Sequence, residues 1–178
     1  MRTLRLSLVG TVILALLGGL GGVAIAQMDA EADAVYVTPV SEEPVSSDSG
    51  TITRGQTLYS SRDGENITIS EWSDPRVSGK TTVVWNVDVD PKTGQGIMWG
   101  TNRIENDDGT WEGPFSGIEY EPPGEDDYFT VNGWLTGDGE YAGYTFFFQV
   151  DAYQYGGPTR KLHGIIFKGQ PPSPEPGK

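Results

Sequence analysis

The single histidine of this 178-residue chain is the side chain best suited to acid–base chemistry. Imidazole is the side-chain group that ordinarily titrates close to neutrality, and His163 is the only histidine in the sequence. No Gly-x-Ser-x-Gly motif supplies a nucleophile for it, and the absence of cysteine excludes thiolate catalysis and cysteine-bound metals. Sites that need two imidazoles are excluded as well. A non-enzymatic role is therefore the favoured interpretation, and no catalytic residue is assigned.

Acidic side chains concentrate in turns, where calcium is the cation that they could bind. Asp88 and Asp90 have the spacing of the start of a calcium-binding loop, but Pro91 interrupts it, and the later glycine and closing glutamate are missing. A solvated turn is the favoured interpretation. We predict neither a metal site nor a cofactor. Carboxylate pairs for glycoside hydrolysis cannot be chosen among 25 acidic residues, because their separation is spatial.

Aromatic residues are the strongest candidates for ligand binding. We predict that an apolar or planar ligand would contact five side chains: Trp85, Trp99, Trp111, Tyr141 and His163. The competing interpretation is that the aromatic rings fill the core. Core packing is favoured for Trp85 and Trp111, because their neighbours alternate regularly and a buried aromatic ring removes a large area from water.

A second aromatic group should lie on an outer surface. Trp134 shares the parity of Tyr128, whereas Phe129, Val131 and Leu135 have the opposite parity and form the apolar set. An exposed tryptophan beside a tyrosine is typical of a recognition surface. We therefore predict Tyr128 and Trp134 as surface-binding residues.

The elements that must position these residues are strands, because apolar residues recur at every second position. The clearest alternation runs from Thr81 to Val89, and no helical spacing persists over a useful length. Glycine, proline and aspartate turns separate the candidate strands. We predict strands over 50–59, 65–72, 79–88, 96–105, 110–120, 128–135, 140–150 and 160–168.

We expect an all-β protein that forms a small antiparallel eight-stranded closed barrel, because closure removes both sheet edges. A β-sandwich is the second choice. Gly113 and Gly117 share a face with Trp111 and Phe115, and this alternation of bulk with glycine suits a tightly curved interior. Pro114 implies an edge or a bulge, because it cannot donate a hydrogen bond to a neighbouring strand.

The N-terminal region has the pattern of a secretory signal. Arg2 and Arg5 precede an uncharged apolar stretch that ends in small residues, so residues 1–26 are predicted to be a signal peptide cleaved before Gln27. An uncleaved membrane anchor is the alternative, because the stretch approaches the length of a spanning helix. We expect an extracellular or periplasmic protein.

The remaining chain divides by composition. Residues 27–49 are acidic and predicted to be a flexible spacer, 50–169 the barrel domain, and 170–178 a proline-rich tail. The whole chain has 12 basic and 25 acidic residues and a net charge of −13. This balance argues against nucleic-acid binding, and against attraction to an anionic membrane. No stable membrane insertion is expected once the signal is removed.

Four short motifs resemble those of uncharacterised exported bacterial proteins. They are Trp99-Gly100-Thr101, Gly109-Thr110-Trp111-Glu112-Gly113, the Gly137–Gly143 hairpin and Leu162-His163-Gly164-Ile165-Ile166. Their general form is similar to the allene oxide cyclase and dirigent barrels. The resemblance implies an eight-stranded antiparallel barrel and the possibility of homo-oligomers. No catalytic residue of the cyclases matches a position in this chain.

These observations favour a non-catalytic module that binds a small apolar or aromatic ligand or serves a structural or interaction role. One alternative is an isomerase or cyclase-like enzyme that folds an apolar substrate in an aromatic-lined barrel. Another is a protein that binds a partner through its outer surface. A dry, closed interior would remove both the ligand-binding and the enzyme hypotheses, whereas an open cavity that contains a polar residue with a strongly shifted pKa would favour the enzyme.

Overall fold

The computed structural model of the chain describes residues 34–121, 128–153 and 161–172. The predicted signal peptide, the first part of the predicted spacer and most of the predicted tail lie outside these ranges. No helix formed by the described residues has the length and apolar character needed to cross a bilayer.

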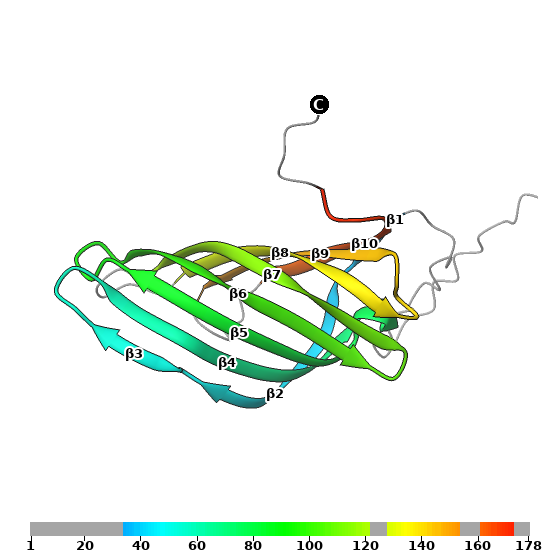
Figure 1. Cartoon of the computed structure of the whole chain (residues 1–178), viewed down its shortest axis with the longest axis horizontal. Coiled ribbons are helices and arrows are strands. Elements are labelled where there is room, and N and C mark those ends of the chain that lie inside the picture. Colours follow the sequence, from blue (N-terminus) through cyan, green and yellow to red (C-terminus); the bar gives the residue numbers. More distant parts are fainter. Residues whose placement is uncertain (1–33, 122–127, 154–160, 173–178) are drawn as a thin grey trace, which may run out of the picture.

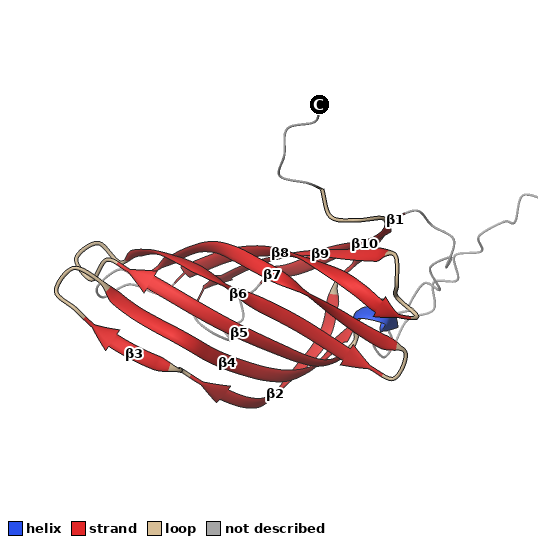
Figure 2. Cartoon of the chain, in the orientation of Figure 1, coloured by secondary structure: helices blue, strands red, loops and turns tan. Residues whose placement is uncertain are grey.

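The described chain is all-β, as predicted, with a single short 3-10 helix (Figures 1 and 2). The strands are β1 (Ala34–Val37), β2 (Pro39–Asp48), β3 (Thr51–Arg54), β4 (Tyr59–Trp72), β5 (Gly79–Val89), β6 (Gln95–Asn106), β7 (Gly109–Tyr120), β8 (Tyr128–Gly139), β9 (Tyr144–Tyr153) and β10 (Lys161–Lys168), and η1 is Pro75–Val77. They form one antiparallel sheet in the order β1-β10-β9-β8-β7-β6-β5-β4-β2, with β3 also paired to β4.

The closed eight-stranded barrel is not confirmed, because the ten strands form an open half-barrel (Figure 1). The sheet path ends at β1 on one side and at β2 on the other. These two strands are separated only by Thr38, whose N–H bonds Ser73 Oγ at 3.0 Å and whose carbonyl accepts from Ser73 N at 2.8 Å. One chain segment therefore links the two sides of the sheet at a single end.

The prediction of a flexible spacer was wrong for residues 34–48, which form β1 and β2. In β1, Val35 and Val37 are buried and pair with β10. In β2, all ten residues are exposed, and the strand has β4 as its neighbour. An edge strand with little buried surface needs no apolar alternation and tolerates acidic residues and proline, so its sequence resembles that of a linker.

Two predicted interruptions have a different form in the structure. The turn expected between the predicted strands 50–59 and 65–72 contains Arg62-Asp63-Gly64 and is an irregularity inside β4: the register against β5 shifts between Ser61 and Gly64, and Asp63 has a φ of 57°. Conversely, the stretch after Gly139 is a turn, so β8 is longer and β9 begins later than predicted. Glycine and aspartate favour both bulges and hairpin turns, so these residue types alone do not distinguish one from the other.

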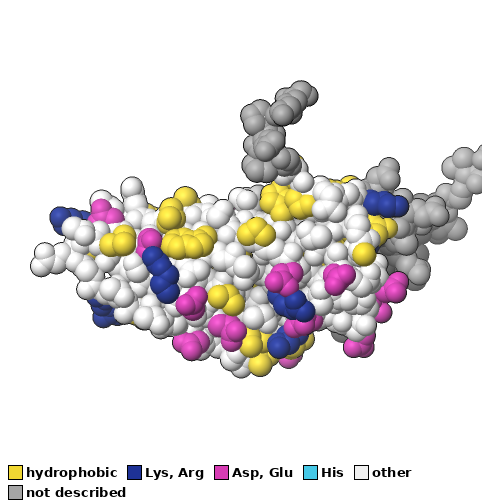
Figure 3. Space-filling view, viewed as in Figure 1, with side chains coloured by type: hydrophobic (Ala, Val, Ile, Leu, Met, Phe, Trp, Pro, Cys, Tyr) yellow, Lys and Arg dark blue, Asp and Glu magenta, His cyan; other side chains and the backbone are white. Residues whose placement is uncertain are grey.

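The concave face of the sheet carries the core. On β5, Val87 and Val89 are buried, and Trp85 packs against the same cluster, which confirms the predicted parity of this strand. The opposite, convex face of β4 to β7 bears charged side chains interspersed with separate apolar ones (Figure 3). The inner face is therefore the place where an apolar ligand can be held.

Candidate ligand-binding cavity

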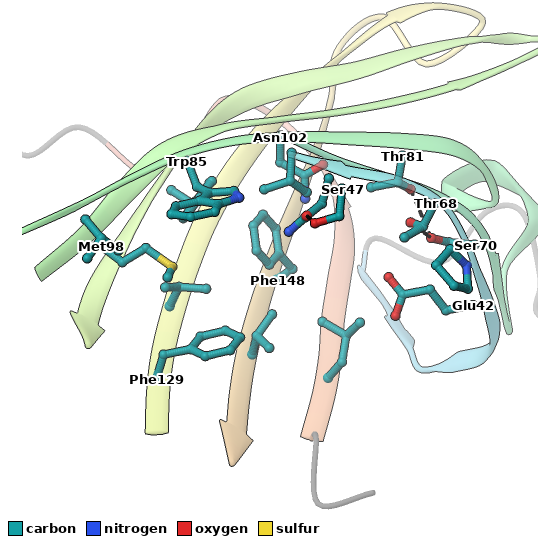
Figure 4. A pocket seen from close by; sticks show the side chains of 18 of the residues that line it. Glu42, Ser47, Thr68, Ser70, Thr81, Trp85, Met98, Asn102, Phe129 and Phe148 are labelled. Atoms are coloured by element: carbon teal, nitrogen blue, oxygen red, sulfur yellow. Dashed lines mark hydrogen bonds between the residues drawn. The ribbon is translucent and has the colours of Figure 1, made fainter. Parts of the chain in front are cut away.

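A cavity of about 840 Å³ lies on the concave side of the sheet (Figure 4). It is lined from β2 to β6 on one side and from β7 to β10 on the other. Its walls differ in character. The described residues that make the polar wall include Ser47, Asn66, Thr68, Ser70, Thr81 and Asn102, and those that make the apolar wall include Phe129, Val131, Phe148, Val150 and Leu162.

The hydroxyl groups of the polar wall are bonded to one another. Ser70 Oγ lies 3.2 Å from Thr68 Oγ1 and 3.1 Å from Thr81 Oγ1, so a chain of hydroxyls crosses from β4 to β5 (Figure 4). Ser47 Oγ donates to Asn66 Oδ1 at 2.7 Å, from β2 to β4. These groups therefore already have partners in the protein.

Two polar atoms at the cavity have no such partner. Within the described structure, Trp85 Nε1 and Asn102 Oδ1 are buried and make no hydrogen bond. Asn102 is paired in register with Val83, and Trp85 with Gly100, so the two side chains are diagonal neighbours on one face of adjacent strands. The indole N–H can only donate, and the amide oxygen accepts.

Glycine explains how the indole of Trp85 lies along the wall. Gly64 on β4 is the register partner of Trp85, and a Cβ added to Gly64 would lie 2.4 Å from the Trp85 Cε2 atom. No real side chain tolerates such a contact, so the ring occupies the space that a larger residue would take. The short Arg62–Gly64 irregularity thus positions a potential ligand contact.

The cavity is uncharged except at two acidic residues. Among the described residues that line it, Glu42 and Glu121 are charged, and none is Lys, Arg or His. The described residues also contain no group of three or more potential metal ligands. The arrangement can hold an apolar molecule and form hydrogen bonds with it.

Of the five predicted ligand-binding residues, Trp85 lines this cavity and Trp111 and Tyr141 lie beyond its end. Trp111 is 1 % exposed, and its Nε1 donates to Arg76 O at 2.7 Å. The Tyr141 ring stacks on it, with centroids 5.1 Å apart, and the Tyr141 hydroxyl donates to Asn106 Oδ1 at 2.7 Å. Burial raises the pKa of Tyr141, although the bond with Asn106 opposes this. Both rings are packed, and the indole N–H and the phenol hydroxyl both have hydrogen-bond partners.

Trp111 and Tyr141 also border a second, smaller space. This depression of about 580 Å³ is lined by Arg76, Asp108, Trp111, Glu140, Tyr141 and Tyr144. Arg76 is held in place by Asp74, and its guanidinium carbon lies 5.9 Å from the centroid of the Tyr144 ring. A ligand role for Trp111 or Tyr141 would therefore concern this depression, not the large cavity.

The prediction is wrong for the other two residues, Trp99 and His163, because neither faces the cavity. Trp99 lies on the convex face, where the Arg62 guanidinium sits 5.0 Å from its ring centroid. His163 also lies there, and its ring stacks on Tyr36 with centroids 6.0 Å apart. Each has the opposite parity to the inward residues of its strand, so alternation within β6 and β10 is the signal that would have excluded them.

Trp134 has the predicted outward orientation. Its ring lies 4.4 Å from the Phe147 ring and 6.2 Å from that of Phe167, between centroids. Tyr128 is on the same face of β8, but six residues along a strand separate them by about 20 Å. The neighbours of Trp134 come from β9 and β10, and the predicted Tyr128–Trp134 pair is not a contact.

Sequence reasoning missed the polar residues of the cavity. Asn102, Thr68 and Ser70 carry no motif, yet each has the parity of buried apolar neighbours on its strand. A polar residue with core parity is the signal that could have found them, because a buried polar group needs a partner.

Comparison with known proteins adds no family to this geometry. The chain matches no protein-family model, and neither curated proteins nor solved structures gave a match. The resemblance to the allene oxide cyclase and dirigent barrels therefore stays an expectation based on the motifs in the sequence.

Proposed function

We propose that this protein binds a small, largely apolar ligand in the concave cavity, without transforming it. The supporting observation is the cavity itself: about 840 Å³, with an apolar wall facing a polar one. Ligand sites in proteins commonly enclose about 300–1,000 Å³ and combine apolar walls with a few polar groups. In a protein without such a site, the same side chains would pack against one another. The side chains around Trp111 pack in this way.

The chemistry of the lining supports binding as the primary role. The polar wall offers hydroxyl, amide and indole groups, which orient a ligand by hydrogen bonds. The hydroxyls of Thr68, Ser70 and Thr81 are linked to each other and have no imidazole or amine beside them within the described lining. Such a wall can orient a bound ligand and shield it from water.

The proposal is tested by a matched pair of substitutions on neighbouring positions of β5. Val83 lines the cavity, and Val84 points to the opposite face. Val83→Phe would fill part of the cavity, whereas Val84→Phe adds the same ring outside it. The measurement is the fluorescence of the uncharged apolar dye phenylnaphthylamine, titrated with each purified protein.

We expect Val83→Phe to weaken dye binding about tenfold or more, and Val84→Phe to leave it unchanged. Thermal unfolding followed by circular dichroism checks that both variants fold. The proposal fails when the parent protein does not bind the dye, or when both substitutions reduce binding equally.

We further propose that this binding occurs outside the cytoplasm, supported by Arg2 and Arg5, the apolar stretch after them and the small residues before Gln27. The intact mass of the protein recovered from its host tests this. Loss of the first 26 residues is expected, and a full-length mass would contradict it.

A further inference from the structure

Trp85 and Asn102 each have a polar atom at the cavity that makes no hydrogen bond to the described residues. Trp85 Nε1 is a buried donor and Asn102 Oδ1 a buried acceptor, and neither has a partner within the described structure. Buried polar groups in folded proteins nearly always have one, and an exception calls for a ligand, a water or an ion. The other polar groups of this wall are different, because Thr68, Ser70 and Thr81 satisfy each other.

The two atoms are complementary in a way that specifies a chemical group. A hydroxyl can accept from an indole N–H and at the same time donate to an amide oxygen. An ether or a ketone only accepts, so it would leave Asn102 Oδ1 unpaired. Figure 4 shows Trp85 and Asn102 on one wall of the cavity, with the Trp85 nitrogen at the edge of the ring on the side of Asn102.

The charges of the lining exclude an anionic ligand. Glu42 and Glu121 are the charged groups among the described lining residues, and no basic side chain of this lining could pair with a carboxylate. An unpaired carboxylate that leaves water loses far more hydration energy than a hydroxyl does. The polar group of the ligand is therefore uncharged.

The opposite wall specifies the rest of the molecule. Phe129 and Phe148 project into the cavity in Figure 4, and Val131, Val150 and Leu162 continue the apolar surface. Such a surface gains free energy in proportion to the apolar area that a ligand removes from water. The body of the ligand is thus a hydrocarbon chain or ring system.

We propose that the cavity binds an uncharged lipophilic alcohol, whose hydroxyl accepts a hydrogen bond from Trp85 Nε1 and donates one to Asn102 Oδ1. This inference rests on the proposed function and adds the class of ligand. It also assigns distinct roles to two residues: Trp85 recognises the oxygen of the hydroxyl, and Asn102 recognises its hydrogen.

The test compares three probes that share one hydrocarbon chain: decanol, decyl methyl ether and decanoate. Each displaces phenylnaphthylamine from the parent protein in a competition titration. We expect decanol to bind about tenfold more tightly than the ether, which cannot donate, and decanoate to bind more weakly than decanol. Equal affinities for decanol and the ether would overturn the proposal, because a bridging water would then satisfy both atoms.

Two substitutions assign the effect to the proposed residues. Trp85→Phe removes the donor and keeps an aromatic ring, and Asn102→Leu removes the acceptor. Asn102→Leu should abolish the preference for decanol over the ether, and Trp85→Phe should weaken both probes, because both can accept from the indole. Trp99→Phe, on the convex face, is the control and should change neither affinity.

The outcomes separate the inference from the proposed function. A parent protein that binds neither the dye nor any probe contradicts the proposed function itself. A protein that binds the dye and all probes alike, or keeps its alcohol preference after Asn102→Leu, contradicts only the alcohol assignment. Far-ultraviolet circular dichroism and dye binding establish that each variant is folded. A second variant, Asn102→Val, also removes the acceptor and should likewise abolish the preference for decanol should the leucine variant not fold.

Discussion

Trp85 and Trp111 are the same residue type on the same face of one sheet, yet they border two different regions. Trp111 lies under η1, where Arg76 O accepts its N–H and Tyr141 stacks on its ring. Trp85 lies in the cavity, where its N–H has no partner among the described residues. One end of the half-barrel is filled by protein, and the remainder leaves space.

The difference shows that strand parity places a side chain but does not determine its role. Both tryptophans face inward because of the period of their strands. The segment between β4 and β5 folds over one end and presents a carbonyl to Trp111. No equivalent segment of the described chain satisfies Trp85, so this residue remains available to a ligand.

Replacing each tryptophan by alanine gives the largest expected contrast between the two regions. Trp111→Ala should lower the free energy of unfolding by about 3–5 kcal/mol, because it opens a cavity within a packed cluster. Trp85→Ala should cost clearly less, since part of its ring already borders empty space. Urea denaturation measures both, and equal losses would remove the distinction between the packed end and the cavity.

The carbonyl that accepts from Trp111 belongs to η1, and Asp74 caps this short helix. Asp74 is buried, and its carboxylate accepts from the Arg76 backbone N–H at 3.0 Å and from the Arg76 side chain at 2.6 Å. Asp74→Asn should cost about 2 kcal/mol at neutral pH, because it weakens charge-assisted hydrogen bonds. Urea denaturation of both proteins gives the value, and an unchanged stability would show that η1 needs no such cap.

The same substitution has a defined pH dependence. Burial raises the pKa of Asp74, but the hydrogen bonds and positive charge of Arg76 outweigh burial and leave the pKa below its ordinary value of 3.8. The stabilisation is thus fully present above that value and is lost as the pH falls through the lower, folded-state pKa. The gap between the parent and Asp74→Asn should narrow in this acidic range. A gap that stays constant from neutral pH to strong acid would contradict the assignment.

Replacing Trp111 or Trp85 by phenylalanine tests the contribution of a single hydrogen bond. Trp111→Phe removes the bond to Arg76 O and should cost about 1 kcal/mol beyond the loss of ring area, whereas Trp85→Phe removes no protein hydrogen bond. Thermal unfolding of the two variants under identical conditions measures the difference. A greater loss for Trp85→Phe would indicate that its N–H has a structural partner.

The smallest effect is expected on the convex face of the cavity wall. Arg103 forms ion pairs with Glu105, at 3.0 Å, and with Glu112, all at exposed positions. Water and salt screen such pairs, so Arg103→Gln should leave the melting temperature and dye binding unchanged within experimental error. A clear loss of either would mean that the outer wall helps to shape the cavity.

Alternation within strands was the most reliable information in the sequence. It predicts β5 to β7 closely, and it predicts the inward orientation of Trp85 and Trp111 and the outward orientation of Trp134. The prediction failed for residues 34–48, because an edge strand buries too little surface to require an apolar pattern. The ligand contacts predicted for Trp99 and His163 are wrong for the opposite reason, because both residues have the outward parity of their strands β6 and β10.

By itself, the sequence determined that this is an antiparallel all-β protein and which side chains share a face, since a period of two is a local property of the backbone. Only the tertiary structure decided that Trp111 is satisfied by Arg76 O, that Trp85 and Asn102 are left with unpaired polar atoms, and that a cavity separates the two walls. These facts depend on which distant segments meet. Hydrogen-bond partners and empty space arise from contacts between such segments, and no local pattern encodes them.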